Sequence, residues 1–216
     1  MKLYLFRHGQ TDWNKVHRFQ GRIDIPLNDF GRELARVTAQ RWPIVPYDRV
    51  YCSPLDRAQE TARLVLEGRE EAEHVIIDPR IIEFGFGENE GKNIDEAGND
   101  PQNAMYNLLH HPEQYVPAPG AESFYDLVER ARGFLFDEIL PLEKQGMQNI
   151  LVVAHGALIR GLVCAAGKKE IADFWDCPYF NCCLTTLDIT NGEITLEREA
   201  EVFYNSDGLF GGWTKK

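Results

Sequence analysis

The sequence predicts a three-layer α/β/α sandwich with a mainly parallel central sheet and an antiparallel hairpin at one edge. Short apolar runs alternate with longer segments of helical periodicity along most of the chain, which is typical of parallel strands joined by crossover helices. Near the carboxyl end, two strand-like segments flank Asn191-Gly192. This dipeptide strongly favours a two-residue hairpin turn, and it predicts the antiparallel edge.

The predicted strands are short. Residues 3–6 form a continuous apolar run, which predicts a strand buried on both faces of the sheet. Asn149–Ala154 is the most strongly apolar of these segments. The other predicted strands cover residues 48–52, 74–78, 184–189 and 193–202.

The predicted helices begin at polar capping residues. Asn28 is the expected N-cap of a helix that runs to about residue 41, before prolines 43 and 46. Ser53 and Pro54 predict a second helix start, and Gly68 the end of that helix. The other predicted helices are residues 101–110, a long amphipathic helix that starts at Ser123, and residues 157–166.

The length of 216 residues fits a single domain, residues 1–216. Residues 92–122 lie between proline- and glycine-bearing segments. An insertion of this kind commonly forms a cap or lid over a site. Residues 207–216 are expected to be a loosely held tail.

The formal net charge of −11 argues against nucleic acid and anionic membranes as partners. No apolar run is long enough to span a bilayer, and the chain leads directly into its first strand, so we expect a cytoplasmic protein. Five cysteines without C-x-x-C spacing predict buried thiols in a reducing compartment, and neither a disulfide framework nor a zinc site. The oligomeric state stays open, with a homodimer as one option.

The first strand ends in Arg7-His8-Gly9, and the strand Asn149–Ala154 ends similarly in His155-Gly156. A glycine after a strand permits a sharp turn or a close backbone approach. Open α/β sheets bind ligands at the carboxyl ends of their strands. A lone histidine there could simply be a satisfied polar residue, but neutral imidazole is also a good nucleophile toward phosphorus.

Four segments, in this order, resemble the motifs of the histidine phosphatase superfamily, the phosphoglycerate-mutase-like enzymes. They are Leu5-Phe-Arg-His-Gly-Gln-Thr11, Ser53-Pro-Leu-Asp-Arg-Ala-Gln-Glu-Thr-Ala62, Glu83-x-x-x-Gly-x-x-x-Gly91 and Val152-Val-Ala-His-Gly156. In that family the histidine of the first motif, here His8, is transiently phosphorylated. The resemblance covers nearly the whole chain. It implies a small phosphorylated substrate and neither a metal ion nor a cofactor.

The resemblance also implies roles for the other motif residues. Arg7 and Arg57 would bind the phosphoryl group, because a guanidinium gives two parallel hydrogen bonds to its oxygens. Arg57 would lie in the first turn of a helix whose free N–H groups face the ligand; otherwise it could be a surface arginine paired with Asp56 or Glu60. His155 would be a further donor, as an imidazolium.

Some residues of the first motif and of the segment after it would line the phosphate and substrate side of the pocket. Alternatively, they could be turn residues that bond to the backbone. They are Thr11, Asn14, Gln20 and Gly21. We also expect four arginines to make one pocket positive inside the acidic chain: Arg7, Arg22, Arg57 and Arg160.

The leaving oxygen of a phosphomonoester needs a proton, and Glu83 is the expected donor. Its apolar neighbours in the sequence, together with a nearby anion, would favour the protonated acid. Glu88 and Glu90 are rival carboxylates in the same loop.

The predicted function is hydrolysis of a phosphomonoester through a phosphohistidine intermediate. The alternatives are a cofactor-dependent phosphoglycerate mutase and a non-catalytic protein that binds a phosphorylated ligand. A mutase would clamp the substrate carboxylate with extra cations, and residues 92–122 offer only Lys92 besides His110 and His111, which favours hydrolysis. Sugar phosphates, cofactor-precursor phosphates such as α-ribazole phosphate, and phosphoproteins all remain candidate substrates.

Overall fold

The computed structural model describes residues 1–42, 45–207 and 209. A six-stranded sheet with the order β3-β2-β4-β1-β5-β6 forms its centre. The first four strands in this order are parallel, and β5 and β6 run antiparallel at the other edge. The strands are β1 Lys2–Arg7, β2 Arg49–Cys52, β3 Val75–Ile77, β4 Asn149–Ala154, β5 Leu184–Thr190 and β6 Glu193–Glu201. The predicted mainly parallel sheet with an antiparallel hairpin is confirmed.

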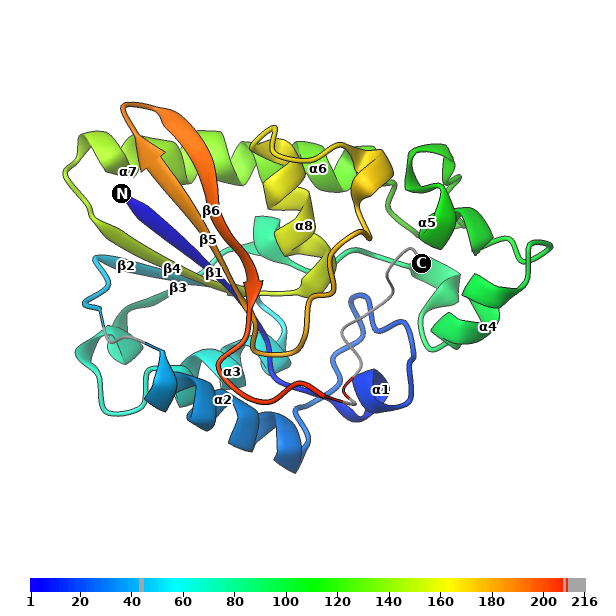
Figure 1. The fold of residues 1–216 in the computed structure, drawn as a ribbon, viewed down its shortest axis with the longest axis horizontal. Coiled ribbons are helices and arrows are strands. Elements are labelled where there is room, and N and C mark those ends of the chain that lie inside the picture. Colours follow the sequence, from blue (N-terminus) through cyan, green and yellow to red (C-terminus); the bar gives the residue numbers. More distant parts are fainter. Residues whose placement is uncertain (43–44, 208, 210–216) are drawn as a thin grey trace.

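Helices cover both faces of this sheet (Figure 1). On one face lie α2 (Asp29–Arg41) and α3 (Asp56–Val65), and on the other lie α6 (Phe124–Gly133) and α8 (Gly156–Ala165). The long helix continues from α6 through the π-helical turn Phe134–Ile139 into α7 (Leu140–Lys144). The predicted three layers are therefore confirmed. The shorter helices are α1 Asp12–Lys15, α4 Ile94–Asn99 and α5 Tyr106–His110, with 3-10 turns at Glu70–His74, Pro79–Ile81, Gly87–Asn89, Pro112–Gln114 and Ile171–Asp173.

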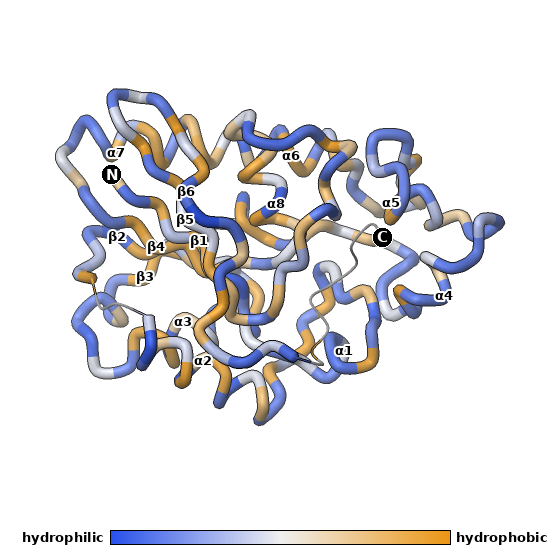
Figure 2. Tube along the Cα trace, viewed as in Figure 1, coloured by the Kyte–Doolittle hydropathy of each residue, from blue (hydrophilic) through white to orange (hydrophobic). Residues whose placement is uncertain are grey.

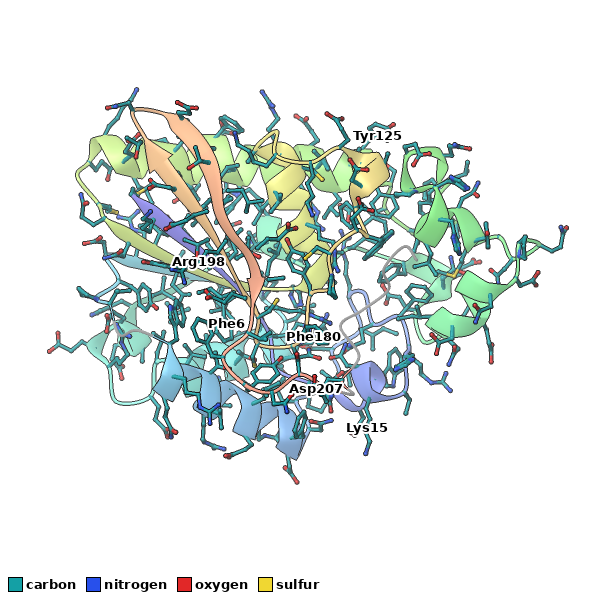
Figure 3. The ribbon with its side chains drawn as sticks, viewed as in Figure 1. Phe6, Lys15, Tyr125, Phe180, Arg198 and Asp207 are labelled. Carbon is teal, nitrogen blue, oxygen red and sulfur yellow. The ribbon has the colours of Figure 1, made fainter. Side chains whose placement is uncertain are left out.

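The core consists of two apolar clusters separated by the sheet. Strand β1 contributes to both, because Leu3 and Leu5 pack with α6 and α8, whereas Phe6 packs with α2 and α3. Figure 2 shows the hydrophobic residues concentrated along the central strands. In Figure 3, Phe6 lies in the interior while Lys15 projects from the outside. The central strand that carries His8 is thus buried on both sides.

Two predicted helix caps are confirmed. The Asn28 side-chain oxygen accepts a hydrogen bond from Gly31 N at 2.8 Å, and Ser123 caps α6 through the Asp126 amide at 3.1 Å. The third predicted cap, Ser53, is wrong, because α3 begins only at Asp56. The Ser53 hydroxyl lies instead 2.6 Å from His155 Nε2. The Ser53 side chain therefore makes a tertiary contact instead of the helix cap that local rules predict.

The predicted helix at residues 101–110 is wrong in its first half. Residues 101–105 form turns, and only Tyr106–His110 is helical, as α5. The preceding helix, α4, already ends at Asn99. Asn93 caps α4 through the amides of Asp95 and Glu96. Asp100 cannot easily continue that helix because it precedes Pro101, and its carboxylate caps the following turn through Gln102 N at 2.9 Å.

Several boundaries also differ. The strand predicted at residues 74–78 is reduced to β3 at the edge of the sheet, where Ile76 and Ile77 are 40% and 44% exposed. The hairpin turn forms as predicted, since Asn191 and Gly192 both have positive φ angles, of 54° and 79°. Proline 43 lies outside the described residues. Of the predicted tail, only Asp207 and Leu209 are described.

All five cysteines are free thiols, as predicted, but only Cys52, Cys182 and Cys183 are buried, whereas Cys164 and Cys177 are partly exposed. Cys182 and Cys183 are buried in the two different apolar clusters, so their side chains lie on opposite sides of the sheet. Within the part of the chain that the structure describes, no helix has the length and apolar character needed to cross a bilayer.

Candidate active site

Parallel pairing of β1 with β4 brings the two histidines together. Arg7 pairs with Ala154 at the carboxyl ends of these strands, so His8 and His155 leave the sheet side by side. Their ring centroids lie 5.1 Å apart, with the ring planes at 60°. Both side chains are buried.

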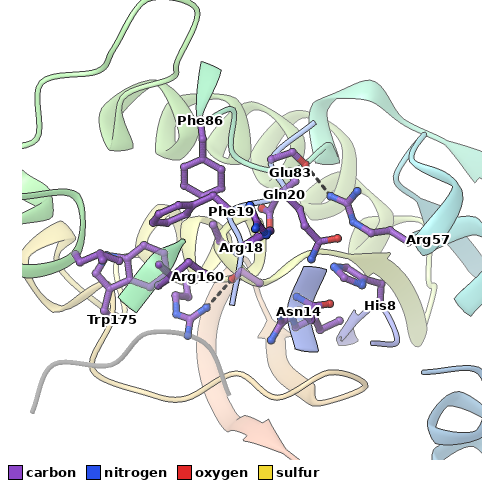
Figure 4. Close-up of a pocket in the computed structure, with 16 residues that line it drawn as sticks. His8, Asn14, Arg18, Phe19, Gln20, Arg57, Glu83, Phe86, Arg160 and Trp175 are labelled. Atoms are coloured by element: carbon purple, nitrogen blue, oxygen red, sulfur yellow. Dashed lines mark hydrogen bonds between the residues drawn. The ribbon is translucent and has the colours of Figure 1, made fainter. Parts of the chain in front are cut away.

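A cavity of about 80 Å³ opens at this end of the sheet (Figure 4). Most of the predicted site residues line it, whereas His155 and Thr11 are not among its lining residues. The polar lining is Arg7, His8, Asn14, Arg18, Gln20, Arg57, Glu83 and Arg160, and the remaining lining is Phe19, Gly21, Phe86, Ile94, Leu109, Gly156, Ala157 and Trp175.

The His8 ring is held in one tautomer. Its Nδ1 lies 2.7 Å from the Gly9 carbonyl oxygen, which can only accept, so Nδ1 carries the proton and Nε2 carries the lone pair. Burial lowers the pKa of His8 well below 6.5, and the charges of Arg57 and Arg7 lower it further. At neutral pH the ring is therefore uncharged, with a free lone pair at the cavity.

The two predicted phosphate-binding arginines are buried, and backbone carbonyls hold both of them. Arg7 donates through Nη1 to the Tyr179 carbonyl. Arg57 donates to the carbonyls of Ile23 at 2.8 Å and Gly21 at 2.7 Å, so Gly21 acts through its backbone. The Nε atoms of both arginines are buried without a hydrogen-bond partner in the described residues.

The surroundings of Arg57 exclude the surface alternative. Burial lowers the pKa of Arg57 to about 10, so it stays protonated at neutral pH. The nearest carboxylate is that of Asp24, 4.0 Å from Nη1. Asp24 also accepts from Asp56 N at 3.0 Å, which caps the start of α3. The expectation that this helix start offers free N–H groups to a ligand is thus wrong at Asp56.

His155 is fully buried, and its Nδ1 has no partner among the residues that the structure describes. Burial lowers the pKa of His155 well below 6.5, and Arg57, His8 and Arg7 lower it further. Burial, together with the neighbouring His8 ring and the Arg7 and Arg57 guanidinium groups, thus favours a neutral His155 over the expected imidazolium.

Glu83 is buried at the amino-terminal end of α8. Its carboxylate accepts hydrogen bonds from Phe84 N at 2.8 Å, Leu158 N at 3.0 Å and Ala157 N at 3.3 Å. The buried apolar neighbours expected from the sequence, such as Ile81 and Phe84, are thus only part of its setting, because three N–H groups also orient this carboxylate.

The two rival carboxylates of this loop do not line the cavity. Glu88 is exposed. Glu90 accepts from Arg22 N at 3.0 Å and Phe86 N at 3.3 Å, and so ties two loops together. Arg22, expected in the positive pocket, instead bonds to the Glu83 carbonyl at 3.3 Å.

Thr11, Asn14 and Gln20 form one buried network. Thr11 caps α1 by accepting from Asn14 N at 3.1 Å, and its hydroxyl lies 2.8 Å from Gln20 Oε1. The Asn14 side-chain oxygen accepts from Thr11 N at 3.1 Å. Both alternatives raised by the sequence therefore hold in part, since Thr11 is a turn residue while Asn14 and Gln20 also line the cavity.

Asn181 is a site residue that the sequence analysis did not find. Its buried amide nitrogen lies 3.1 Å from the His8 carbonyl, 3.2 Å from the Gly9 carbonyl and 3.2 Å from Asn14 Oδ1. It therefore supports the carbonyl that sets the His8 tautomer and the orientation of the Asn14 amide. No motif marks this residue, because only the fold brings it to the His8 loop.

The wall of the cavity opposite His8 was also missed. It is apolar and includes Phe19, Phe86 and Trp175, together with Ile94 and Leu109 from the insertion 92–122. These two contacts and the position of α4 and α5 beyond the sheet (Figure 1) fit the predicted cap. Within residues 1–42, 45–207 and 209, no three histidine, cysteine or acidic side chains gather closely enough to hold a metal ion.

A buried anion site beside a neutral histidine suits a class of enzymes that handle phosphoryl groups. Comparison with known proteins identifies the class. Residues 3–202 match the family model of the histidine phosphatase superfamily (branch 1), and the chain belongs to this family.

Its relatives include phosphatases and mutases. The chain is 31% identical over 195 residues to a putative phosphoserine phosphatase 2 of Hydrogenobacter thermophilus, covering 90% of this chain and 93% of the relative. It is 30% identical over 199 residues to an adenosylcobalamin/alpha-ribazole phosphatase of Salmonella typhimurium, covering 91% and 95%. Phosphoglycerate mutases also match.

The fold agrees with a solved member of this group. A phosphoserine phosphatase of Entamoeba histolytica, crystallised in complex with phosphoserine, superimposes with a TM-score of 0.77 at 27% identity. The match covers 91% of this chain and 95% of that chain.

We expect Asn181→Leu to lower kcat for phosphomonoester hydrolysis by about tenfold or more, because the His8 carbonyl group loses a support that positions the nucleophile. Steady-state kinetics and a thermal melt test this, with Asn149→Leu at the opposite end of β4 as the control. An unchanged kcat in a folded Asn181→Leu protein would show that the amide has no positioning role.

Proposed function

We propose that the protein hydrolyses the phosphomonoester of a small phosphorylated metabolite through a phosphohistidine at His8. The observation that carries this proposal is the neutral His8 ring, whose tautomer leaves Nε2 free beside two buried arginines. A nucleophile and an anion-binding site in contact are the minimum that phosphoryl transfer to a side chain requires.

In the first step, Arg7 and Arg57 bind the oxygens of the phosphoryl group, and His8 Nε2 attacks phosphorus. The bond from phosphorus to the leaving oxygen breaks, and that oxygen takes a proton from Glu83. The bound dianion favours the protonated acid, because a nearby negative charge opposes ionisation of a carboxyl group. Asn14, Gln20 and His155 are proposed as further donors to the phosphoryl oxygens.

In the second step, a water molecule attacks phosphorus and gives a proton to the Glu83 carboxylate. The bond between phosphorus and Nε2 breaks, inorganic phosphate leaves, and His8 returns to its neutral form. Glu83 thus acts first as an acid and then as a base. Positioning and charge stabilisation supply most of the catalysis.

A phosphoglycerate mutase is the second candidate, because mutases are among the relatives. The shortage of cations that disfavours a mutase applies only to residues 92–122. The structure brings Arg18 and Arg160 to the cavity from other segments, so the cation count does not separate the two functions. Release of phosphate, compared with isomerisation of 3-phosphoglycerate, does separate them.

The cellular setting belongs to the same proposal. We propose a cytoplasmic enzyme, and the five free thiols support a reducing compartment. A homodimer stays a prediction, which light scattering after gel filtration would decide.

A phosphoryl linkage that is stable in base distinguishes the proposed phosphohistidine intermediate. After a brief reaction with a substrate labelled on phosphorus and a denaturing quench in base, we expect label on the wild type and on His74→Ala, but not on His8→Ala. His74 is an exposed residue far from the cavity. Label that persists in His8→Ala would rule out His8 as the nucleophile, and turnover without any trapped label would remove support for the intermediate.

Glu83→Gln tests the proton donor. An alkyl leaving group needs a proton more than p-nitrophenolate does, so the variant should lose about 10² to 10⁴ of kcat/KM on an alkyl phosphate and much less on p-nitrophenyl phosphate. Glu88→Gln, at an exposed carboxylate of the same loop, should match the wild type. Equal losses on both esters would assign Glu83 a structural role only.

The lowered pKa of His8 predicts a pH profile. The neutral ring is the reactive form, so acid inactivates the enzyme only when the pH falls to the lowered pKa. The acid limb of kcat/KM should therefore lie below pH 6.5, and NMR titration should place His8 there too. Arg57→Gln should raise the pKa, because Arg57 lowers it in the wild type. A His8 titration at or above pH 6.5 in the wild type would contradict this.

A further inference from the structure

Arg160 is a buried cation without a carboxylate partner. It lies in α8, is 5% exposed, and forms no ion pair with the residues that the structure describes. It donates to the carbonyls of Gly156 at 3.1 Å and Cys177 at 2.8 Å. Its Nε is buried and has no hydrogen-bond partner among the described residues. Neutral acceptors thus satisfy part of this guanidinium and leave its charge unbalanced.

Two aromatic rings hold Arg160 at the cavity. The guanidinium carbon lies 4.1 Å from the centre of the Tyr179 ring and 5.0 Å from that of Trp175. Both Arg160 and Trp175 line the cavity, and Figure 4 shows them beside each other on its side away from Arg57. The rings therefore fix the cation at one place on the cavity wall.

A second cation lies next to it. A Cβ built on Gly156 would be 3.2 Å from Arg7 Nε and 3.4 Å from Arg160 Nη1, so the two guanidinium groups flank the same glycine. Like charges held this close in a buried site repel, and burial together with Arg7 lowers the pKa of Arg160. A negative charge supplied by a ligand would relieve that repulsion.

The phosphoryl dianion does not account for all of these cations. In the proposed mechanism its two charges face Arg7 and Arg57, and Arg57 also has Asp24 at 4.0 Å. Arg160 and, at the cavity mouth, the exposed Arg18 remain without a carboxylate within ion-pair distance in the described part of the chain. The buried cation is thus available for another anionic group of the substrate.

We propose that Arg160 forms a second anion subsite, and that the preferred substrates are small phosphomonoesters whose leaving group carries a carboxylate. This inference rests on the proposed function and names its substrate class. The leaving group would lie along the apolar wall, with the phosphoryl group at His8 and the carboxylate at Arg160.

Two esters that differ only in the carboxylate test the subsite: phosphoserine and phosphoethanolamine. The wild type should favour phosphoserine by about tenfold or more in kcat/KM, the range expected for a hydrogen bond to a charged group. Arg160→Met keeps an unbranched side chain between the rings but removes the charge. It should raise KM for phosphoserine by about tenfold, with kcat/KM for phosphoethanolamine and p-nitrophenyl phosphate changed less than about threefold. Arg160→Lys should retain part of the preference.

The outcomes distinguish failure of the proposed subsite from failure of the proposed function. A wild type that does not favour phosphoserine overturns the subsite, whatever the variants do. Equal losses on all three esters in Arg160→Met overturn it too, because they show that Arg160 only packs the loop against α8. If the wild type hydrolyses none of the three esters, the proposed function fails, and the subsite fails with it.

Discussion

The backbone on both sides of His8 is held by three distant parts of the chain, and the rest of the site depends on this constraint. His8 N donates to the Ala154 carbonyl at 3.0 Å, and Arg7 N donates to the Cys183 carbonyl at 3.0 Å. Gly9 N donates to the Thr61 hydroxyl at 2.9 Å. A strand end that frays in most proteins is therefore immobilised here, and the imidazole is presented from a rigid support.

The next constraint is the close packing behind that support. A Cβ on Gly9 would lie 2.6 Å from the Gly31 carbonyl, so this turn can lie against the start of α2 only because residue 9 is glycine. A glycine after a strand permits either a sharp turn or a close backbone approach, and Gly9 shows the close approach. The tight packing fixes the Gly9 carbonyl, which in turn selects the tautomer of His8.

The charge of the site is preserved because its arginines are held mainly by carbonyls. Tyr179 accepts from Arg7, Gly21 from Arg57 and Cys177 from Arg160. A carbonyl satisfies an N–H donor without cancelling the charge of the guanidinium, whereas a carboxylate would cancel it. The uncancelled charge adds to burial, the largest cause, in lowering the pKa of both histidines, so the groups that attract an anion also favour the neutral nucleophile.

The sequence by itself determined the fold class and most of the site. Buried strands and capped helices depend on local periodicity, which is why the sheet, α2 and the hairpin at Asn191-Gly192 could be predicted. Three of the four motifs contribute a predicted catalytic side chain to one cavity, namely His8, Arg57 and Glu83. Local rules failed where tertiary contacts competed with them, as at Ser53, which contacts His155 instead of capping α3.

Only the tertiary structure decided the electrostatics and the supporting residues. The sequence cannot show how far water is excluded from His155, and burial is the largest cause of its lowered pKa. Likewise, packing of distant segments brings Asn181 to the His8 carbonyl, and it places Arg160, which the sequence led us to expect in the pocket, against the Tyr179 and Trp175 rings. Chain neighbours determine secondary structure, whereas protonation, charge balance and substrate contacts depend on groups that are distant in the sequence and close in space.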